Sequence, residues 1–129
     1  VDPAKTVELY TIFLRWERTS LNKRIKERTK DMLLKGWIDE VENLLELQTN
    51  RQTIFSSLNS IGYKHIIRFL NNEISKKEMF EIIYIRTRQL ARRQEKWFKK
   101  EPINLFVMMD SLKGEKIYKI LDCFVNRIP

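Results

Sequence analysis

Residues 75–102 constrain the fold most, because they predict one long helix with a defined start and end. Ser75-Lys76-Lys77-Glu78 has the S-x-x-E pattern in which the first and last side chains cap the first turn of a helix. Pro102 disfavours helical geometry at the residue before it, so we expect the helix to span residues 76–100. A chain organised around such a helix is expected to be mainly α-helical.

Shorter helices and two strands complete the expected secondary structure. Thr19 or Ser20 should cap a helix that ends at Gly36, with Leu21, Ile25, Met32 and Leu33 on its apolar face. Further helices are expected at residues 38–47, from Gly62 to about 71, and at 115–127, with Ile117, Ile120, Leu121 and Phe124 of the last one inward. The polar residues 48–60 predict a loop with one helical turn.

The runs at residues 10–16 and 103–109 are rich in aromatic and β-branched residues and predict short strands. Two short strands do not form a stable sheet by themselves. We therefore expect further strands to come from another part of the polypeptide.

The composition favours ligands that carry negative charge. Of 129 residues, Lys and Arg account for 25 and Asp and Glu for 17, so the formal net charge is +8. Such a chain favours a nucleic acid, a phosphorylated substrate or an acidic membrane surface as its partner. Hydrophobic residues make up 43%, enough for a hydrophobic core in one domain.

Single copies of cysteine and histidine exclude several kinds of site. Cys123 and His65 are the only residues of their types, which rules out a disulfide framework and a zinc site with several thiolates. We expect both to be structural, Cys123 in the core and His65 with its ring hydrogen-bonded. The sequence contains no glycine-rich phosphate loop, no membrane span and no signal-peptide pattern. It also contains no evident nucleophile–base pair, so we expect no catalytic or metal-binding residue here.

The second half of the long helix carries an unusual concentration of positive charge. From residue 86 to residue 100, seven cationic side chains accompany one acid, Glu95. One interpretation is a solvated helix whose Leu90 and Trp97 side chains fill a core. The other is a phosphate-binding surface on which Gln94 supplies directional contacts.

Two further patterns are candidates for binding phosphate or RNA. Arg24 and Arg28 are one helical turn apart and can bind a phosphate or diphosphate together, or else pair with Glu27 or Asp31. The segment from Ile61 to Lys64 combines a glycine that permits close approach, a tyrosine that can stack on a base, and a lysine.

Three motifs, in this order, resemble the C-terminal part of the tRNA dimethylallyltransferase family, also called tRNA isopentenyltransferases. They are Arg24-Ile25-x-x-Arg28-x-x-x-Met32-x-x-x-Gly36-x-x-x-Glu40-Val41, Ile61-Gly62-Tyr63-Lys64, and Thr87-Arg88-x-x-Ala91-Arg92-Arg93-Gln94-x-x-Trp97-Phe98. The resemblance covers roughly residues 15–109. The chain departs from the family at Lys96, where threonine is frequent, and at Leu90, where tyrosine is common.

The resemblance implies a fold and an activity. Enzymes of this family transfer a dimethylallyl group from dimethylallyl diphosphate to the exocyclic amine of the adenosine 3′ of the tRNA anticodon. Their fold is a P-loop kinase-like α/β core, and residues 1–129 would be a single C-terminal segment of that catalytic domain, without the N-terminal half. The P-loop and the general base would lie in the absent half, so we expect the isolated chain to be inactive. Mg²⁺ would act in the full enzyme.

The resemblance also assigns residues. Arg28, with Arg24 beside it, would bind the diphosphate, and tRNA would contact Asn59, Ser60, Ile61, Gly62, Tyr63, Lys64, Arg92, Arg93, Gln94, Trp97 and Lys99. The expected partners are the tRNA anticodon stem-loop, dimethylallyl diphosphate and the absent half of the polypeptide. We expect a monomeric, cytoplasmic enzyme with no membrane contact.

Three alternatives stay open at this point. An adenylate isopentenyltransferase would act on a free nucleotide, although a mononucleotide does not need so long a row of cations. A non-catalytic RNA-binding module and a helical interaction domain with a basic surface are the other two. The salt dependence of binding separates RNA from a mononucleotide, because each phosphate contact releases counterions.

Overall fold

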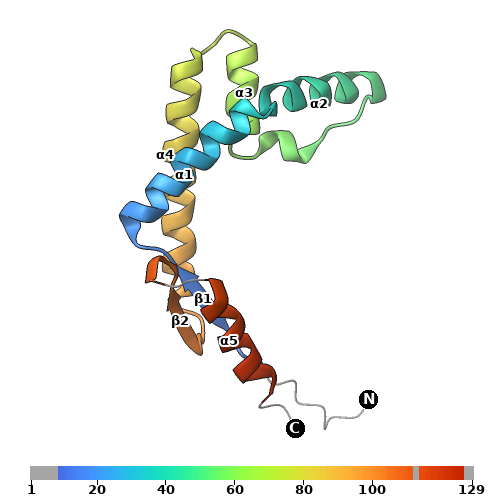
Figure 1. The fold of residues 1–129 in the computed structure, drawn as a ribbon. Helices are drawn as coiled ribbons and strands as arrows, with labels where there is room; N and C mark the ends of the chain where they lie inside the picture. Colours follow the sequence, from blue (N-terminus) through green and yellow to red (C-terminus); the bar gives the residue numbers. More distant parts are fainter. Residues whose placement is uncertain (1–8, 112–113, 127–129) are drawn as a thin grey trace, which may run out of the picture. The chain divides into compact units, whose positions relative to one another are not determined.

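The computed structural model describes residues 9–111 and 114–126, and it is mainly helical with two short strands (Figure 1). Along the chain, the elements are β1 (Ile12–Arg15), α1 (Arg18–Leu34), α2 (Trp37–Arg51), the 3₁₀ helix η1 (Ser56–Asn59), α3 (Tyr63–Leu70), α4 (Lys76–Phe98), β2 (Leu105–Met108), the 3₁₀ helix η2 (Met109–Ser111) and α5 (Gly114–Val125). The predicted class, helical with two short strands, is confirmed.

The chain forms two compact units. The first, which we call the strand unit, comprises residues up to 21 together with residues from 95 onward. The second, the helical unit, comprises residues 22–94. Helices α1 and α4 each contribute residues to both units.

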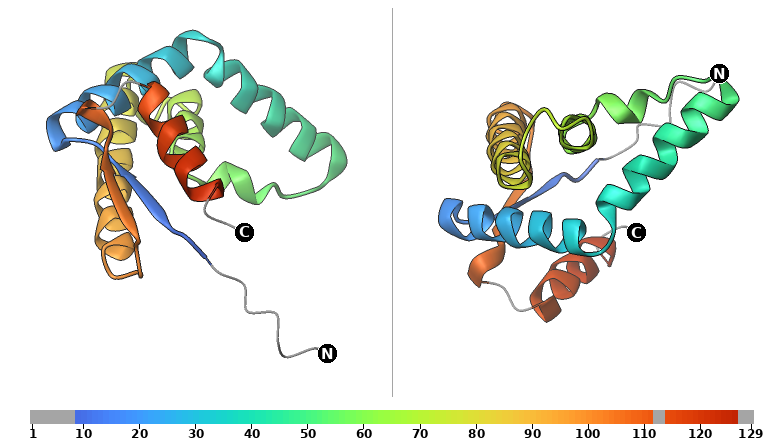
Figure 2. Two further views of the ribbon diagram at one scale, coloured as in Figure 1. Left: turned by 60° about the horizontal axis from the view of Figure 1, so that its bottom comes forward. Right: turned by 90° about the horizontal axis from the view of Figure 1, so that it is seen from above.

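In the strand unit, β1 and β2 lie side by side as a parallel pair (Figure 2). The register pairs Phe13 with Phe106 and Leu14 with Val107, so the members of each pair point to the same face. The Phe13 ring centroid lies 5.8 Å from that of Phe106 and 5.5 Å from that of Phe98, at the end of α4. The end of α4 therefore packs on one face of the strand pair.

The helical unit has its own hydrophobic core. Its buried members come from α2, η1, α3 and α4 and are Trp37, Val41, Leu58, Ile66, Met79 and Ile83. Met32 and Leu33 of α1 pack against this core while half-buried, as do Leu44 and Leu45 of α2. Met32 and Leu33, two of the four apolar residues predicted for the face of the first helix, therefore contact this core.

Three predicted helix boundaries are also confirmed. Gly36 ends α1 with a φ of 100°, and Gly62 precedes α3 with a φ of 94°. The Ser75 N–H donates to Glu78 Oε2 at 2.7 Å, and the Glu78 N–H donates to Ser75 Oγ at 3.1 Å. This reciprocal pair is the capping box that the sequence predicts for the start of α4.

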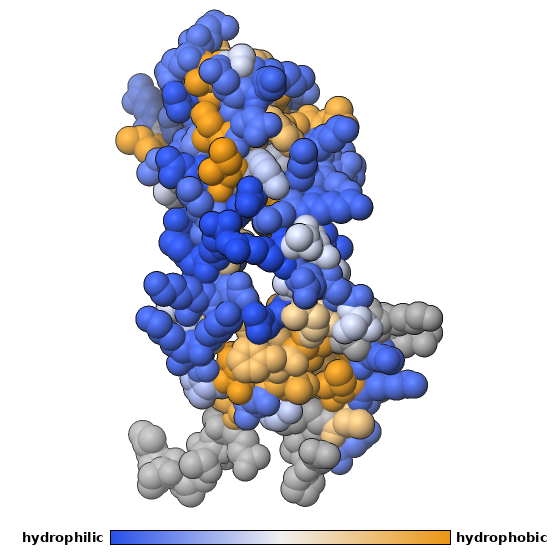
Figure 3. Space-filling view, turned by 90° about the vertical axis from the view of Figure 1, so that its left-hand side faces the viewer, coloured by the Kyte–Doolittle hydropathy of each residue, from blue (hydrophilic) through white to orange (hydrophobic). Residues whose placement is uncertain are grey.

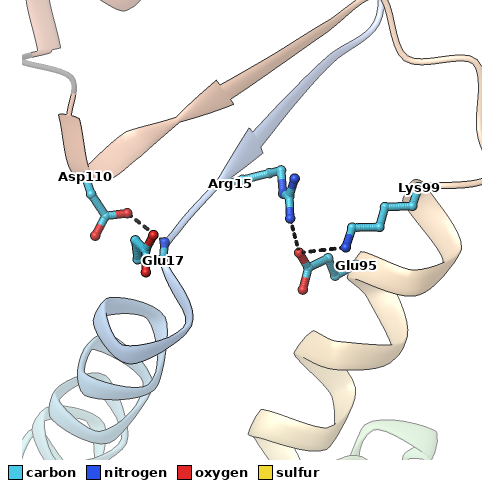
Figure 4. A network of polar contacts seen from close by, with 5 residues as sticks. All are labelled: Arg15, Glu17, Glu95, Lys99 and Asp110. Atoms are coloured by element: carbon cyan, nitrogen blue, oxygen red, sulfur yellow. Dashed lines mark hydrogen bonds and ion pairs between the residues drawn. The ribbon is translucent and has the colours of Figure 1, made fainter.

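The start of α1 differs from the prediction. The helix begins at Arg18, ahead of the expected caps Thr19 and Ser20. The reason is a contact to Asp110, which follows β2 in the sequence. The Glu17 backbone N–H donates to Asp110 Oδ1 at 2.7 Å (Figure 4). A carboxylate distant in sequence thus binds the backbone just before the first turn.

The end of α2 is also later than predicted. The helix continues to Arg51 instead of ending at residue 47, because its polar residues lie on the solvent side and do not interrupt it. It stops at Gln52, which has a φ of 49°. The Gln48 side chain then accepts a hydrogen bond from the Phe55 backbone N–H at 2.9 Å, which fixes the following loop. η1 provides the single helical turn expected there.

The last helix is less buried than expected. Ile117 and Ile120 are half-buried, but Leu121 is 41% exposed and Cys123 is exposed, so their predicted inward positions are wrong. No element of the described chain packs extensively against α5, which explains this exposure. The Phe124 side chain and residue 127 lie outside what the structure describes.

Candidate functional site

Three cations near the end of α4 remain available for a ligand. Arg92, Arg93 and Lys96 are exposed, and among the described residues none of them has a hydrogen-bond or ion-pair partner. Gln94 is exposed between them. We call these four residues the α4 polar set. A surface of unpaired guanidinium and ammonium groups can neutralise several phosphates at once.

The acid on this part of α4 is already engaged by a residue that the sequence did not single out. Arg15 Nη2 donates to Glu95 Oε1 at 2.6 Å, and Lys99 Nζ lies 3.6 Å from the same oxygen (Figure 4). The hydrogen bond from Arg15, more than any other influence, holds the pKa of Glu95 below its ordinary value. Lys99, one of the predicted tRNA contacts, therefore shares its charge with Glu95.

Trp97 does not fill a core in the described chain. Its side chain is 59% exposed, and Leu90 is 36% exposed, so the interpretation in which both side chains are internal is wrong. The Trp97 ring instead lies against Phe98 at 4.8 Å between centroids. An exposed indole held by a neighbouring ring presents a face on which a base can stack.

Arg24 and Arg28 both lie exposed on α1. The carboxylates that could compete for them are used by lysines instead, with Lys35 Nζ at 2.7 Å from Asp31 and Lys23 Nζ at 4.0 Å from Glu27. Arg28 has no hydrogen-bond or ion-pair partner in the described part of the chain. For Arg28, the expected alternative, a surface ion pair with Glu27 or Asp31, is therefore not found among the described residues.

The segment from Asn59 to Lys64 combines exposed residues with residues used for packing. Asn59, Ser60 and Lys64 are exposed, and Ile61 is half-buried. The Tyr63 hydroxyl donates to Glu40 Oε1 at 2.8 Å, and this bond raises the pKa of Tyr63 because the proton is shared with a carboxylate.

The other residues of that segment face Trp37. The rings of Tyr63 and Trp37 meet edge to face at 5.8 Å, and the backbone of Gly62 is buried against the same indole. Tyr63 and Gly62 thus have structural roles, and their assignments as tRNA contacts stay predictions. Of their exposed neighbours, Asn59 and Lys64 offer side chains to a ligand, whereas the Ser60 hydroxyl donates to the Ser57 carbonyl at 2.6 Å.

A second contact missed in the sequence joins α1 to α4 within the helical unit. Arg88 Nε donates to Asn22 Oδ1 at 3.1 Å, and the Arg88 guanidinium lies 5.2 Å from the centre of the Tyr84 ring. Arg88 therefore fixes the start of the helix that carries Arg28 against α4. Nothing in the spacing of Asn22 and Arg88 along the chain indicates this pairing.

Several kinds of site are absent from the part of the chain that the structure describes. Within residues 9–111 and 114–126, no group of three or more His, Cys, Asp or Glu side chains could hold a metal ion. No helix in the same residues is long and apolar enough to cross a membrane.

A family model and known proteins match most of this chain. A family model described as IPP transferase matches residues 2–101. The tRNA dimethylallyltransferase of Campylobacter jejuni (strain RM1221) is 43% identical over 96 residues, which are 74% of this chain and 32% of that protein. That of Petrotoga mobilis is 40% identical over 119 residues, which are 92% of this chain and 39% of that protein.

Two solved structures have the same fold. A full-length tRNA isopentenylpyrophosphate transferase from Bacillus halodurans gives a TM-score of 0.80 at 28% identity. The match covers 96% of this chain and 40% of the Bacillus halodurans chain. A tRNA delta(2)-isopentenylpyrophosphate transferase from Staphylococcus epidermidis gives 0.85 at 25% identity, covering 98% and 40%. The chain thus spans less than half the length of each of these relatives.

Proposed function

This chain belongs to the IPP transferase family, and from that membership we propose that it is the tRNA-binding C-terminal part of a tRNA dimethylallyltransferase. The complete enzyme would transfer a dimethylallyl group to the exocyclic amine of the adenosine 3′ of the anticodon. The chain would provide contacts to the anticodon stem-loop and one arginine for the diphosphate.

The observation that carries the proposal is the α4 polar set. Its three cations are exposed and lack partners in the described chain, while the one nearby acid is bound by Arg15 and Lys99. In RNA binding, such cations replace the counterions of the phosphate backbone, and Gln94 and Trp97 add a directional contact and a stacking surface. A free mononucleotide would use only a small part of this surface.

Arg28 would act on the leaving group. In the reaction the amine nitrogen forms a bond to the allylic carbon, the carbon–oxygen bond breaks, and the electron pair leaves with the diphosphate. Negative charge therefore grows on the diphosphate, where a preorganised guanidinium lowers the barrier. Arg28 is suited to this role because it is exposed and unpaired in the described residues.

The rest of the active site would come from the remainder of the full-length enzyme. The general base and the P-loop belong there, and Mg²⁺ would be held through the substrate phosphates and groups outside the described residues. Hydrophobic side chains gather on one face of the strand unit (Figure 3). Leu14 points to one face of the strand pair, whereas Phe106 and Met108 point to the other, and all three are between 38% and 48% exposed. This exposure is expected if further elements of the full-length enzyme cover both faces.

The test is the salt dependence of RNA binding. Fluorescence anisotropy would measure the affinity of the chain for a labelled anticodon stem-loop at several KCl concentrations. We expect the affinity to fall steeply with salt, and the variant R92E/R93E to bind at least tenfold more weakly with a slope lower by about two charges. The control R51E/K119E removes the same charge from α2 and α5.

Equal losses in the two variants would refute a specific role for α4. A shallow salt dependence with tight binding of AMP would favour an adenylate isopentenyltransferase instead. For catalysis, we expect prenylation of the stem-loop by the full-length enzyme and none by residues 1–129. Transfer by the isolated chain would contradict the assignment of the general base to the absent half.

A further inference from the structure

We propose that a hollow between the end of α1 and the start of α4 binds small amphipathic anions, molecules with an apolar tail and a fully ionised head such as an alkyl phosphate. The hollow lies within the helical unit and measures about 380 Å³. It is lined by Lys30, Leu33 and Leu34 of α1 and by Lys76, Lys77 and Phe80 of α4. Its volume is in the range of small-molecule sites.

The apolar part of the lining would hold the tail. Leu33 and Phe80 are half-buried, while Leu34 is 76% exposed although it stands beside them. An apolar ligand chain in the hollow would remove the Leu34 side chain from water, which is favourable in proportion to the area covered. The hollow thus offers an apolar surface that the described chain leaves uncovered.

The lysines would hold the head. Lys30, Lys76 and Lys77 are exposed and have no ion pair in the described residues. Two of the neighbouring carboxylates are engaged elsewhere, since Asp31 is bound to Lys35 at 2.7 Å and Glu73 is bound to Arg68 at 3.2 Å. Three ammonium groups without a counter-ion next to an apolar surface are complementary to an anion that carries an apolar tail.

The chemistry of the lining argues against a nucleobase. Lysine side chains donate hydrogen bonds and accept none, and leucine and phenylalanine do neither. The edge of a nucleobase presents donors as well as acceptors, and its donors would find no side-chain partner here. A carboxylate or phosphate head only accepts hydrogen bonds and is fully satisfied by ammonium groups. The hollow therefore favours an amphipathic anion over an unpaired nucleotide.

This site is separate from the residue proposed to hold the diphosphate. Arg28 and Lys30 are two positions apart on α1, and residues with that spacing lie on different sides of a helix. Binding in the hollow can therefore be measured independently of Arg28 and of RNA. Failure of one proposal leaves the other intact.

Isothermal titration of the chain with decyl phosphate, below its micelle concentration, tests the proposal. We expect one saturable site per chain, with inorganic phosphate at least tenfold weaker and decyltrimethylammonium not bound. The variant K76E/K77E should bind decyl phosphate at least tenfold more weakly, and Leu34→Ser should also weaken it. The variant K76E/K77E should fold, because acids are favourable in the first turn of a helix, and circular dichroism verifies this.

The control R51E/K119E carries the same charge change outside the hollow and should bind decyl phosphate like the parent chain. Equal affinity of K76E/K77E and the parent would overturn the proposal, as would equal affinity for decyltrimethylammonium or for inorganic phosphate. Displacement of decyl phosphate by an anticodon stem-loop would assign the hollow to RNA and overturn it as well.

Discussion

The indole ring of Trp37 occupies the space that any side chain at residue 62 would need. A Cβ placed on Gly62 would lie 2.2 Å from both Cη2 and Cζ2 of this ring. Gly62 also has a φ of 94°, a conformation that other residues rarely adopt. Because Trp37 belongs to the buried core, its ring has little room to move. The start of α3 therefore depends on this glycine.

We expect Gly62→Ala to lower the free energy of unfolding by about 2–6 kcal/mol. This is the sum of about 1–3 kcal/mol for a sparsely populated backbone conformation and about 1–3 kcal/mol for overpacking. Gly36→Ala is the matched control, since its φ is 100° but the nearest atom to an added Cβ is Asp39 Oδ2 at 3.9 Å. It should cost only about 1–2 kcal/mol. Urea denaturation measures both, and equal losses would show that the Trp37 ring gives way.

Buried His65 should make stability depend on pH near neutrality. The side chain is 6% exposed, and neither ring nitrogen has a hydrogen-bond partner in the described structure, so the predicted hydrogen-bonded ring is not found. Burial, and then the charges of Lys64, Arg68 and Arg86, lower the pKa of His65 below 6.5. The unfolded chain therefore takes up a proton below pH 6.5 that the folded chain excludes, and stability falls as the pH drops.

We expect His65→Leu to raise the free energy of unfolding at pH 7 by about 1–3 kcal/mol, because two buried polar atoms without partners are removed. The gap between the variant and the parent should widen from pH 7 to pH 5. His65 is the only histidine in the chain, so no other side chain of that type titrates in this window. A constant gap across the range would mean that His65 ionises in the folded state as easily as in the unfolded one.

The features that could be predicted from sequence are local ones. The capping box at Ser75 and Glu78 and the left-handed stop at Gly36 each depend on a few consecutive residues, and the structure shows both. The start of α1 could not be predicted, because its first turn is preceded by a contact to Asp110, far along the chain. The need for glycine at residue 62 could not be predicted either, because it follows from the packing of the Trp37 ring against this residue.

The salt bridge between Arg15 and Glu95 illustrates the same limit at the candidate site. From the sequence, Glu95 is only the single acid in a basic run. In the structure, Arg15 reaches it from β1 at 2.6 Å, with exposed fractions of 30% and 40% for the two side chains. Cations such as Arg92 could be recognised from the run of positive charge in the sequence, whereas the ion pair between Lys99 and Glu95 could not.

Glu95 should stabilise the strand unit only while it is ionised. Its pKa in the folded chain is lowered from 4.5, mainly by the hydrogen bond from Arg15, so its contribution is complete above pH 4.5 and is lost as the pH falls through the lowered value. Because both side chains are partly exposed, we expect Glu95→Gln to cost at most about 1 kcal/mol at pH 7. This cost should shrink as the pH falls below 4.5.

Urea denaturation at pH 7 and pH 3, in low salt, measures this difference. Glu101→Gln serves as the control, since Glu101 is exposed and has no ion pair in the described residues. It should change stability little at either pH. A loss for Glu95→Gln that is equally large at pH 3 would show that the carboxylate charge is not what stabilises the contact.

Arg28 should matter for the donor substrate and not for tRNA. In the full-length enzyme proposed to contain this chain, we expect Arg28→Ala to reduce kcat/KM for dimethylallyl diphosphate roughly 30- to 1000-fold. This factor corresponds to a loss of about 2–4 kcal/mol of transition-state stabilisation. The affinity for the anticodon stem-loop should stay within about twofold, because the α4 polar set is unchanged. Arg51→Ala, at the end of α2, removes an equivalent exposed side chain and should leave both quantities unaltered.

Steady-state kinetics with each substrate varied in turn separates the possible outcomes for Arg28→Ala. A guanidinium that contacts the leaving diphosphate stabilises charge that is larger in the transition state than in the bound substrate, so kcat should fall together with kcat/KM. If the guanidinium only positioned the diphosphate equally in both states, KM would rise while kcat stayed constant. An unchanged rate with the donor substrate would remove Arg28 from the site, and a loss confined to tRNA affinity would place it with the α4 polar set instead.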